Sequence, residues 1–162
     1  MQIGIIADTH DHLTRLDAAL QAFRARGVRH VVHCGDFLAP FALLRFKDKG
    51  FEHVHGVLGN NDGEVLMLKK LFHDIGTLNK PPAFITIGDK LFAVLHEPMP
   101  PEAMAALPVD VVCYGHTHEA VVQRTAGPLI INPGECCGWL HGRATAAVLD
   151  TASMDVNIIE LD

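Results

Sequence analysis

Seven polar side chains of the kinds that bind metal ions follow short apolar runs of the sequence. They are Asp8, His10, Asp36, Asn60, His96, His116 and His118. Carboxylate, amide and imidazole donors without a thiolate suit Mn, Fe, Zn, Co or Ni better than a structural cysteine-zinc site or an all-oxygen calcium site. Seven donors are too many for one tetrahedral ion. They match two ions that share a carboxylate, an arrangement that can clamp the attacking and leaving oxygens of a displacement at phosphorus.

The runs before these side chains have the length and composition of buried strands. Examples are residues 2–7 (QIGIIA), 30–34 (HVVHC) and 53–58 (HVHGVL). Binding sites of α/β sheets form at the carboxyl ends of strands, so we expect the seven donors to meet at one edge. Glycine precedes three of the clusters, at Gly35, Gly59 and Gly115, and permits tight turns and close backbone approach there.

The remaining pattern defines the elements that position these donors. Helical spacing of apolar residues predicts helices over 12–27, 40–47 and 63–72. The second half predicts a hairpin over 83–97, a short helix after Pro101, and strands over 109–115, 120–125, 128–134, 144–150 and 155–161. Alternating strands and helices followed by strands predict one α/β domain, residues 1–162, with mixed sheets.

Composition excludes several classes of protein. With 49% hydrophobic and 20% charged residues among 162, the chain is expected to be globular. A net charge of -6 with 13 Lys and Arg argues against an extended nucleic-acid surface. No apolar stretch approaches the length of a membrane span, and the start MQIGIIAD has no signal-peptide pattern, so no membrane partner is expected.

The four cysteines, Cys34, Cys113, Cys136 and Cys137, are a poor disulfide framework because two lie in apolar runs and two are adjacent. This usage favours a reducing compartment, and we expect a cytoplasmic protein. Eleven histidines are an unusual number. For His30, His33, His53, His55 and His73 we expect core or surface roles, while the roles of His12 and His141 stay open.

The motifs DTH (8–10), CGD (34–36), GNND (59–62), an isolated His96 and GHTH (115–118) occur in the order found in calcineurin-like metallophosphoesterases. The chain resembles most the small bacterial and archaeal phosphodiesterases of the YfcE type. INPGECCGW (131–139) and RATAAVLD (143–150) extend the resemblance over nearly the whole chain. It implies a metallo-dependent phosphatase-like fold, which is a four-layer α/β/β/α sandwich of two mixed sheets.

The resemblance also implies roles for the seven donors. Asp8, His10 and His118 would hold one divalent ion, Asn60, His96 and His116 the other, and Asp36 would bridge them. The implied enzyme is a metal-dependent phosphodiesterase, in which a hydroxide bridging the two ions attacks a small phosphodiester in line. Neither the metal, for which Mn, Ni, Fe, Co and Zn are candidates, nor a homo-oligomeric state follows from the residues.

Two positions depart from the family pattern. Many members have histidine after the asparagine, but this chain has Asn61, which can donate a hydrogen bond and cannot deliver a proton at neutral pH. We still assign Asn61, with Asp36, to the catalytic site and Asn61 to substrate binding. Glu97 replaces the usual glycine after His96, and it could repel anions, bind a metal, act as an acid or face solvent. Arg143 is a further candidate for substrate contact.

An alternative function is a non-catalytic or weakly catalytic scaffold, because a retromer subunit of the same fold works mainly through protein contacts. A dimetal hydrolase acting on amides is a third possibility. All seven donor positions are filled, which favours the enzyme over the scaffold. The order of the motifs argues against the amide hydrolase.

Overall fold

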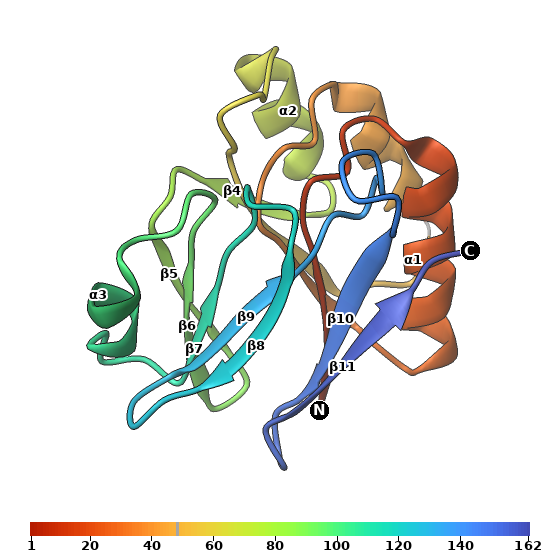
Figure 1. Ribbon diagram of the computed structural model, residues 1–162. Helices are drawn as coiled ribbons and strands as arrows, with labels where there is room; N and C mark the ends of the chain where they lie inside the picture. The colour runs from red at the N-terminus through yellow and green to blue at the C-terminus, as the bar shows by residue number, and fades with distance from the viewer. Residues whose placement is uncertain (48) are drawn as a thin grey trace.

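Two mixed β-sheets form the centre of the computed structural model, which describes residues 1–47 and 49–162 (Figure 1). The first sheet has the strand order β11-β10-β1-β2-β3-β4. Its strands are β1 (Gln2–Ile6), β2 (His30–His33), β3 (His53–Val57), β4 (Gly76–Asn79), β10 (Thr145–Asp150) and β11 (Asp155–Glu160). The strands β1 to β4 run parallel to one another, β10 is antiparallel to β1, and β11 is antiparallel to β10.

The second sheet has the order β5-β6-β7-β9-β8. Its strands are β5 (Ala83–Ile87), β6 (Lys90–Val94), β7 (Val111–Cys113), β8 (Ala120–Arg124) and β9 (Leu129–Pro133). The strands β6, β7 and β9 are parallel, and β5 and β8 are antiparallel to them at the two edges. The predicted hairpin is therefore β5-β6.

Helices cover the outer faces of both sheets. The helices α1 (Leu13–Ala25) and α2 (Val65–Phe72), with the 3-10 helix η1 (Pro40–Arg45), pack on the first sheet. The five-residue helix α3 (Pro101–Ala105) packs on the second through Met104. A separate apolar core, including Ile5, Val32 and Phe92, fills the space between the sheets. The predicted four-layer α/β/β/α sandwich is confirmed.

Periodicity explains the packing of α1. Its buried residues Leu16, Ala19, Leu20 and Phe23 recur at helical spacing and face the first sheet. Burying each large apolar side chain contributes about 1.5–3 kcal/mol. Gly4 of β1 lets the Phe23 ring lie against the strand, because a Cβ at this position would be 2.7 Å from two ring carbons.

Two elements differ from the sequence prediction. The segment predicted as a helix over 40–47 is the six-residue 3-10 helix η1, ending at Arg45. Short runs that begin with proline commonly adopt this tighter geometry. The strand β4 was not predicted, because its four residues Gly76–Asn79 are only half-buried at a sheet edge and carry little apolar periodicity.

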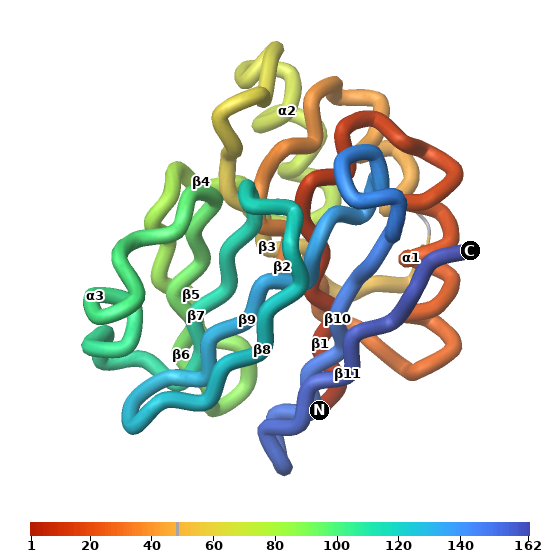
Figure 2. The backbone as a smooth tube through the Cα atoms, in the orientation of Figure 1, coloured from red at the N-terminus to blue at the C-terminus, as the bar shows by residue number. Residues whose placement is uncertain are grey.

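The loops that follow β1 and β9 meet at one end of the molecule (Figure 2). The backbone N–H of Cys136 donates to the carbonyl of Ala7, and that of Cys137 to the carbonyl of Asp8. The N-terminus lies at the opposite end. None of the helices described is both long and apolar enough to cross a membrane.

Candidate metal centre

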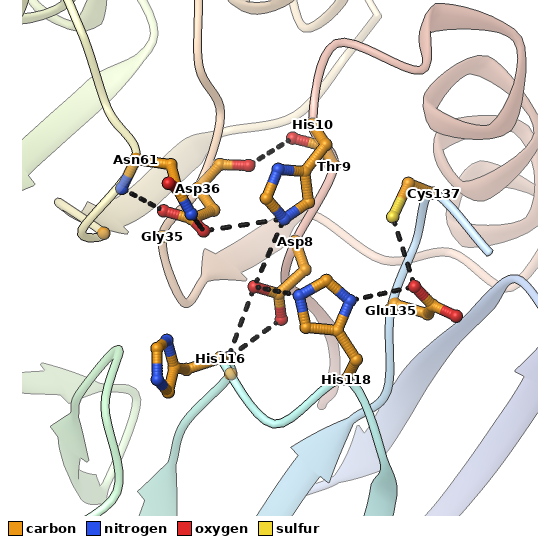
Figure 3. A network of polar contacts seen from close by, with 12 residues as sticks. Asp8, Thr9, His10, Gly35, Asp36, Asn61, His116, His118, Glu135 and Cys137 are labelled. Atoms are coloured by element: carbon orange, nitrogen blue, oxygen red, sulfur yellow. Dashed lines mark hydrogen bonds and ion pairs between the residues drawn. The ribbon is translucent and has the colours of Figure 1, made fainter. Parts of the chain in front are cut away.

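A first group of donors forms where β1 and β2 end. Nε2 of His10 lies 3.5 Å from Oδ2 of Asp36 and 3.9 Å from Oδ1 of Asp8 (Figure 3). Both carboxylates are buried. His10 Nε2 is buried too, yet it has no hydrogen-bond partner among the residues that the structure describes. Buried polar atoms are almost always paired, so an unpaired nitrogen facing two carboxylates fits a site for a cation.

His118 completes this group from the loop after β7. Its Nε2 lies 3.7 Å from Oδ1 of Asp8, and its Nδ1 lies 2.8 Å from Oε2 of Glu135. With the Nδ1 proton donated to Glu135, Nε2 carries a free lone pair directed towards Asp8. A carboxylate behind the second ring nitrogen is the usual support of a metal-binding histidine, because it fixes both the tautomer and the ring orientation.

A second group forms around Asn60 after β3. The side-chain oxygen of Asn60 lies 2.8 Å from Nε2 of His96 and 3.0 Å from Nδ1 of His116. Nε2 of His96 also lies 3.5 Å from Oδ1 of Asp36. The backbone carbonyl of Cys34 accepts the Nδ1 proton of His96 at 2.8 Å, which again leaves Nε2 for another partner. Asp36 thus faces both groups, one with each oxygen.

The electrostatics of the metal-free site favour a bound cation. Burial raises the pKa of Asp8 to about 7, although His118 opposes this rise. Burial also lowers the pKa of His10, so this imidazole is neutral and able to act as a ligand. A divalent ion beside Asp8 would remove the cost of burying its charge, because opposite charge stabilises the ionised carboxylate.

The backbone at the site is unusual. Five of the seven predicted donors have positive φ angles, namely Asp8 (52°), His10 (41°), Asp36 (59°), His116 (67°) and His118 (63°). Residues other than glycine rarely adopt this left-handed region, which costs of order 1–3 kcal/mol at each position. Such strain persists only where the surrounding structure fixes it, and it concentrates at functional sites.

Glycine is required where the loops cross. A Cβ at Gly59 would lie 2.1 Å from Oδ1 of Asp36, and one at Gly35 would lie 2.6 Å from Nδ1 of His96. Both contacts are far too short for real atoms. The predicted role of these two glycines in close backbone approach is therefore confirmed.

Comparison with known proteins identifies the family of this chain. Residues 1–154 match the model of the calcineurin-like phosphoesterase superfamily domain. The chain belongs to this superfamily. It is 40% identical to a phosphodiesterase of Methanocaldococcus jannaschii over 167 residues, covering 100% of both chains.

Solved structures agree with this assignment. An archaeal phosphodiesterase superposes with a TM-score of 0.90 at 38% identity, over 99% of this chain and 100% of that one. The Escherichia coli phosphoesterase YfcE gives a TM-score of 0.73 at 21% identity, with both chains fully covered. A zinc complex of Vps29 from Entamoeba histolytica gives 0.67 at 19% identity, also with full coverage. The last two share the fold.

Two carboxylates that hold this phosphoesterase site together were not assigned roles from the sequence. Asp62, the last residue of GNND, accepts the backbone N–H of Gly59 at 2.7 Å, Leu38 at 2.9 Å and Asp36 at 3.2 Å. It therefore ties the loop carrying Asp36 to the loop carrying Asn60. Its position in the GNND motif, two residues after the donor Asn60, was the available signal.

Glu135 is the second such residue, and it is fully buried. Besides His118, it accepts the backbone N–H of Trp139, Leu140 and His141. Burial alone would raise its pKa, but the hydrogen bonds from His118 and these amides lower the pKa to about 2. Glu135 is thus an anion at neutral pH. In the sequence, only the resemblance of the stretch NPGE to the family indicated that Glu135 lies near the site.

Cys137 also lies closer to the site than its sequence suggested. One donor atom from each of His10, His118 and Cys137 lies within 4.8 Å of the others. Burial raises the pKa of the thiol to about 12, with Glu135 adding to the rise, and Sγ donates to Glu135 at 3.4 Å. The protonated thiol therefore acts as a hydrogen-bond donor behind His118.

The three remaining candidates lie around the rim. The Asn61 side-chain nitrogen donates to Oδ2 of Asp36 at 2.7 Å, and its backbone N–H donates to Oδ1 at 2.9 Å. Glu97 is exposed on the wall of a cavity beside His96. Arg143 lines a different cavity beside His118, but its guanidinium pairs with Glu160.

Proposed function

We propose that the protein is a dimetal phosphodiesterase that hydrolyses small phosphodiesters. The observation that carries this proposal is the position of Asp36 between two groups of donors, with the unpaired Nε2 of His10 facing its carboxylate. Membership of the phosphoesterase superfamily and the 40% identity to an archaeal phosphodiesterase support the same reaction. The donors match divalent transition ions such as Mn, Ni, Fe, Co or Zn.

The proposed ligands of the first ion are Asp8, His10, His118 and Asp36, and those of the second are Asn60, His96, His116 and Asp36. Two such ions supply Lewis acidity towards the phosphoryl oxygens and lower the pKa of water. The protein supplies the spacing and orientation. Glu135 and the Cys34 carbonyl hold His118 and His96 so that Nε2 of each ring faces inward.

The two halves of the proposed site differ in access. In the first half, Asp8 is fully buried and His118 is held by buried Glu135. In the second half, Asn60 and His116 are exposed. We infer that substrate approaches from the second half, where Asn60 and His116 are accessible.

Charge favours diesters over monoesters. Two divalent ions would bring four positive charges, which three carboxylates (Asp8, Asp36 and Glu135) and a hydroxide nucleophile would balance. Burial weakens solvent screening at the site, so any further negative charge is costly. A phosphodiester adds one negative charge, whereas a monoester dianion adds two and leaves the larger negative excess. Arg143 does not offset this excess, because Glu160 already pairs with it.

Asn61 acts in this proposal as a positioning donor. Its amide donates a hydrogen bond to the Asp36 carboxylate and can donate another to a phosphoryl oxygen, but it cannot transfer a proton to a leaving group. The leaving alcohol must therefore depart with most of its negative charge. Good leaving groups are expected to react much faster than poor ones.

The scaffold alternative receives less support, because all seven donors are present and oriented. We place the reaction in the cytoplasm, where the four buried free cysteines would remain reduced.

Hydrolysis of a nitrophenyl diester and of the matching nitrophenyl monoester tests the proposal. The protein is loaded with Mn²⁺ or Ni²⁺, its metal content is measured, and kcat/KM is determined at one pH. We expect about two ions per chain and a higher kcat/KM for the diester. A preference for the monoester would overturn the charge argument. Two bound ions without hydrolysis of either substrate would overturn the enzyme proposal.

A further inference from the structure

A cavity of about 370 Å³ opens beside the second half of the metal centre. Its lining residues come from three loops and are Leu58, Gly59, Asn60, Pro81, Pro82, Leu95, His96, Glu97 and Met99. Asn60 and His96 are therefore shared between this cavity and the proposed ligands of the second ion. A phosphate held at that ion would place one of its ester groups at the mouth of the cavity.

The walls of the cavity are mostly apolar. Leu58, Leu95 and Met99 supply aliphatic and thioether surface, and Pro81 and Pro82 add further apolar surface. Leu95 is buried, while Leu58 and Met99 are half-buried and anchored against core clusters. The volume lies in the lower part of the range of about 300–1,000 Å³ typical of small-molecule sites.

Glu97 gives the cavity its charge. It is the one acidic side chain among the nine lining residues, and no lysine or arginine belongs to that described set. A second anionic group on the substrate would approach this carboxylate without a compensating cation. An uncharged organic group would instead find apolar surface and an adaptable methionine.

The cavity on the other side of the metal centre differs in both size and chemistry. It has about 220 Å³ and includes His118, Glu119, His141 and Arg143 among its lining residues. Its polar and charged side chains do not suit an apolar substituent. The two sides of the site therefore differ in the kind of ester group that they can hold.

We propose that the cavity lined by Leu58, Pro81, Pro82, Leu95 and Met99 binds an uncharged, apolar or aromatic ester group of the phosphodiester substrate. This inference rests on the proposed function, and it narrows the substrate class to monoanionic diesters with at least one bulky neutral alcohol. Met99 and Glu97 are then specificity residues. They select the substituent and leave the reaction at phosphorus to the metal centre.

The test uses diphenyl phosphate and dimethyl phosphate, which share charge and symmetry and differ only in the bulk of the ester group. Isothermal titration calorimetry measures their dissociation constants on the Mn²⁺-loaded protein. We expect diphenyl phosphate to bind at least about 10-fold more tightly, because a partly buried phenyl ring gains most of the free energy of a buried apolar side chain.

The variant Met99→Glu places a charge in the cavity and should remove the preference for diphenyl phosphate, while the added charge lowers the affinity for both anions by a common factor. Met67→Glu is the matched control, because Met67 is 44% exposed on α2 and does not line the cavity. It should keep the wild-type preference, and so should Met99→Leu. If Met99→Glu does not fold, Met99→Ala should still reduce the preference several-fold.

Equal affinity of the wild type for the two phosphates would overturn the inference, as would a preference that survives in Met99→Glu. An equal fold-loss of affinity for both phosphates in Met99→Glu would also contradict it, because the ratio of the two dissociation constants would then be the same as in the wild type. A metal-loaded wild type that hydrolyses no nitrophenyl diester would instead refute the proposed function. The two failures are thus distinguishable.

Discussion

Histidines gather at both ends of the first sheet, and the two groups behave differently. At the carboxyl ends of the strands, histidine nitrogens face carboxylates, as His10 faces Asp36 at 3.5 Å and His118 faces Asp8 at 3.7 Å. At the opposite ends of β2 and β3, the group formed by His30, His53 and His55 faces mainly itself.

Within this second group, Nδ1 of His30 lies 3.4 Å from Nε2 of His55, and the rings of His53 and His55 are 4.3 Å apart. Burial is the main cause that lowers the pKa of His55 to about 4, and the neighbouring His53 and His30 contribute to this shift. The carboxylate in contact with the group, Glu52, is exposed and shared with Arg29. Histidine rings that contact one another in this way form a structural cluster.

The comparison shows that histidine number alone does not indicate a metal site. Buried carboxylates beside an unpaired imidazole nitrogen favour a cation, whereas histidine rings that contact mainly one another do not. The strand ends decide which arrangement forms. Loops after several strands bring Asp and His side chains together at the carboxyl ends of the strands. At the opposite end of the sheet, the histidines come only from β2 and β3.

The largest expected effect comes from Asp36, which faces both groups of site donors. Asp36→Asn should lose most of its bound metal and lower kcat/KM for a nitrophenyl diester by at least about 10³-fold, because the shared charge is gone. Elemental analysis and steady-state kinetics measure both. His30→Gln at the opposite end serves as the control, and equal metal loss in this variant would erase the distinction between the two ends.

A smaller effect is expected from the carboxylate behind His118. Glu135→Gln removes the buried charge and one acceptor for the surrounding amides, and it should weaken metal binding by about 10- to 100-fold. The matched control is Glu52→Gln, since Glu52 contacts His30 at the other end. Metal titrations of the two variants compare them, and the same affinity in both would show that Glu135 does not support the site.

Asn61→His tests the missing proton donor. A histidine can protonate a leaving group, so the rate of hydrolysis of a phenyl ester should increase by about 10-fold. This gain is below the usual contribution of about 10²–10⁴-fold from general acid catalysis, because the ring must also replace the contact of Asn61 with Asp36. A nitrophenyl ester should gain little. Rates measured over a series of leaving-group pKa values give the slope, and an unchanged slope would assign Asn61 to positioning alone.

The smallest effect on activity is expected at His55, where the readout is stability. The pKa of His55 is about 4 in the folded protein and about 6.5 when unfolded, so the unfolded chain binds more protons between these values. The free energy of unfolding should therefore fall as pH decreases from 6.5 to 4, by about 1–2 kcal/mol after allowance for partial exposure.

Chemical denaturation across this pH range measures the slope, and His55→Gln should reduce it. His73→Gln is the control, because the His73 side chain is 91% exposed at the end of α2. A slope that stays the same in His55→Gln would mean that the cluster does not govern acid stability.

Local patterns in the sequence predicted the strands and helices with strong periodicity. Apolar runs gave β1, β2 and β3, and the spacing of Leu16, Leu20 and Phe23 gave α1. The weak edge strand β4 and the 3-10 geometry of η1 did not follow from pattern, since both depend on packing against neighbouring elements. The donors at strand ends were predictable because parallel strands align their carboxyl ends.

The sequence alone predicted the α/β class, the order of the motifs and the seven candidate donors, because periodicity and residue chemistry are local properties. Only the tertiary structure decided that Glu135 supports His118, that Asp62 ties two loops together, and that the apolar cavity adjoins His96. These contacts join residues distant along the chain, as for Glu135 and His118 or for Pro82 and His96. Their distances depend on how the two sheets pack, which no local pattern records.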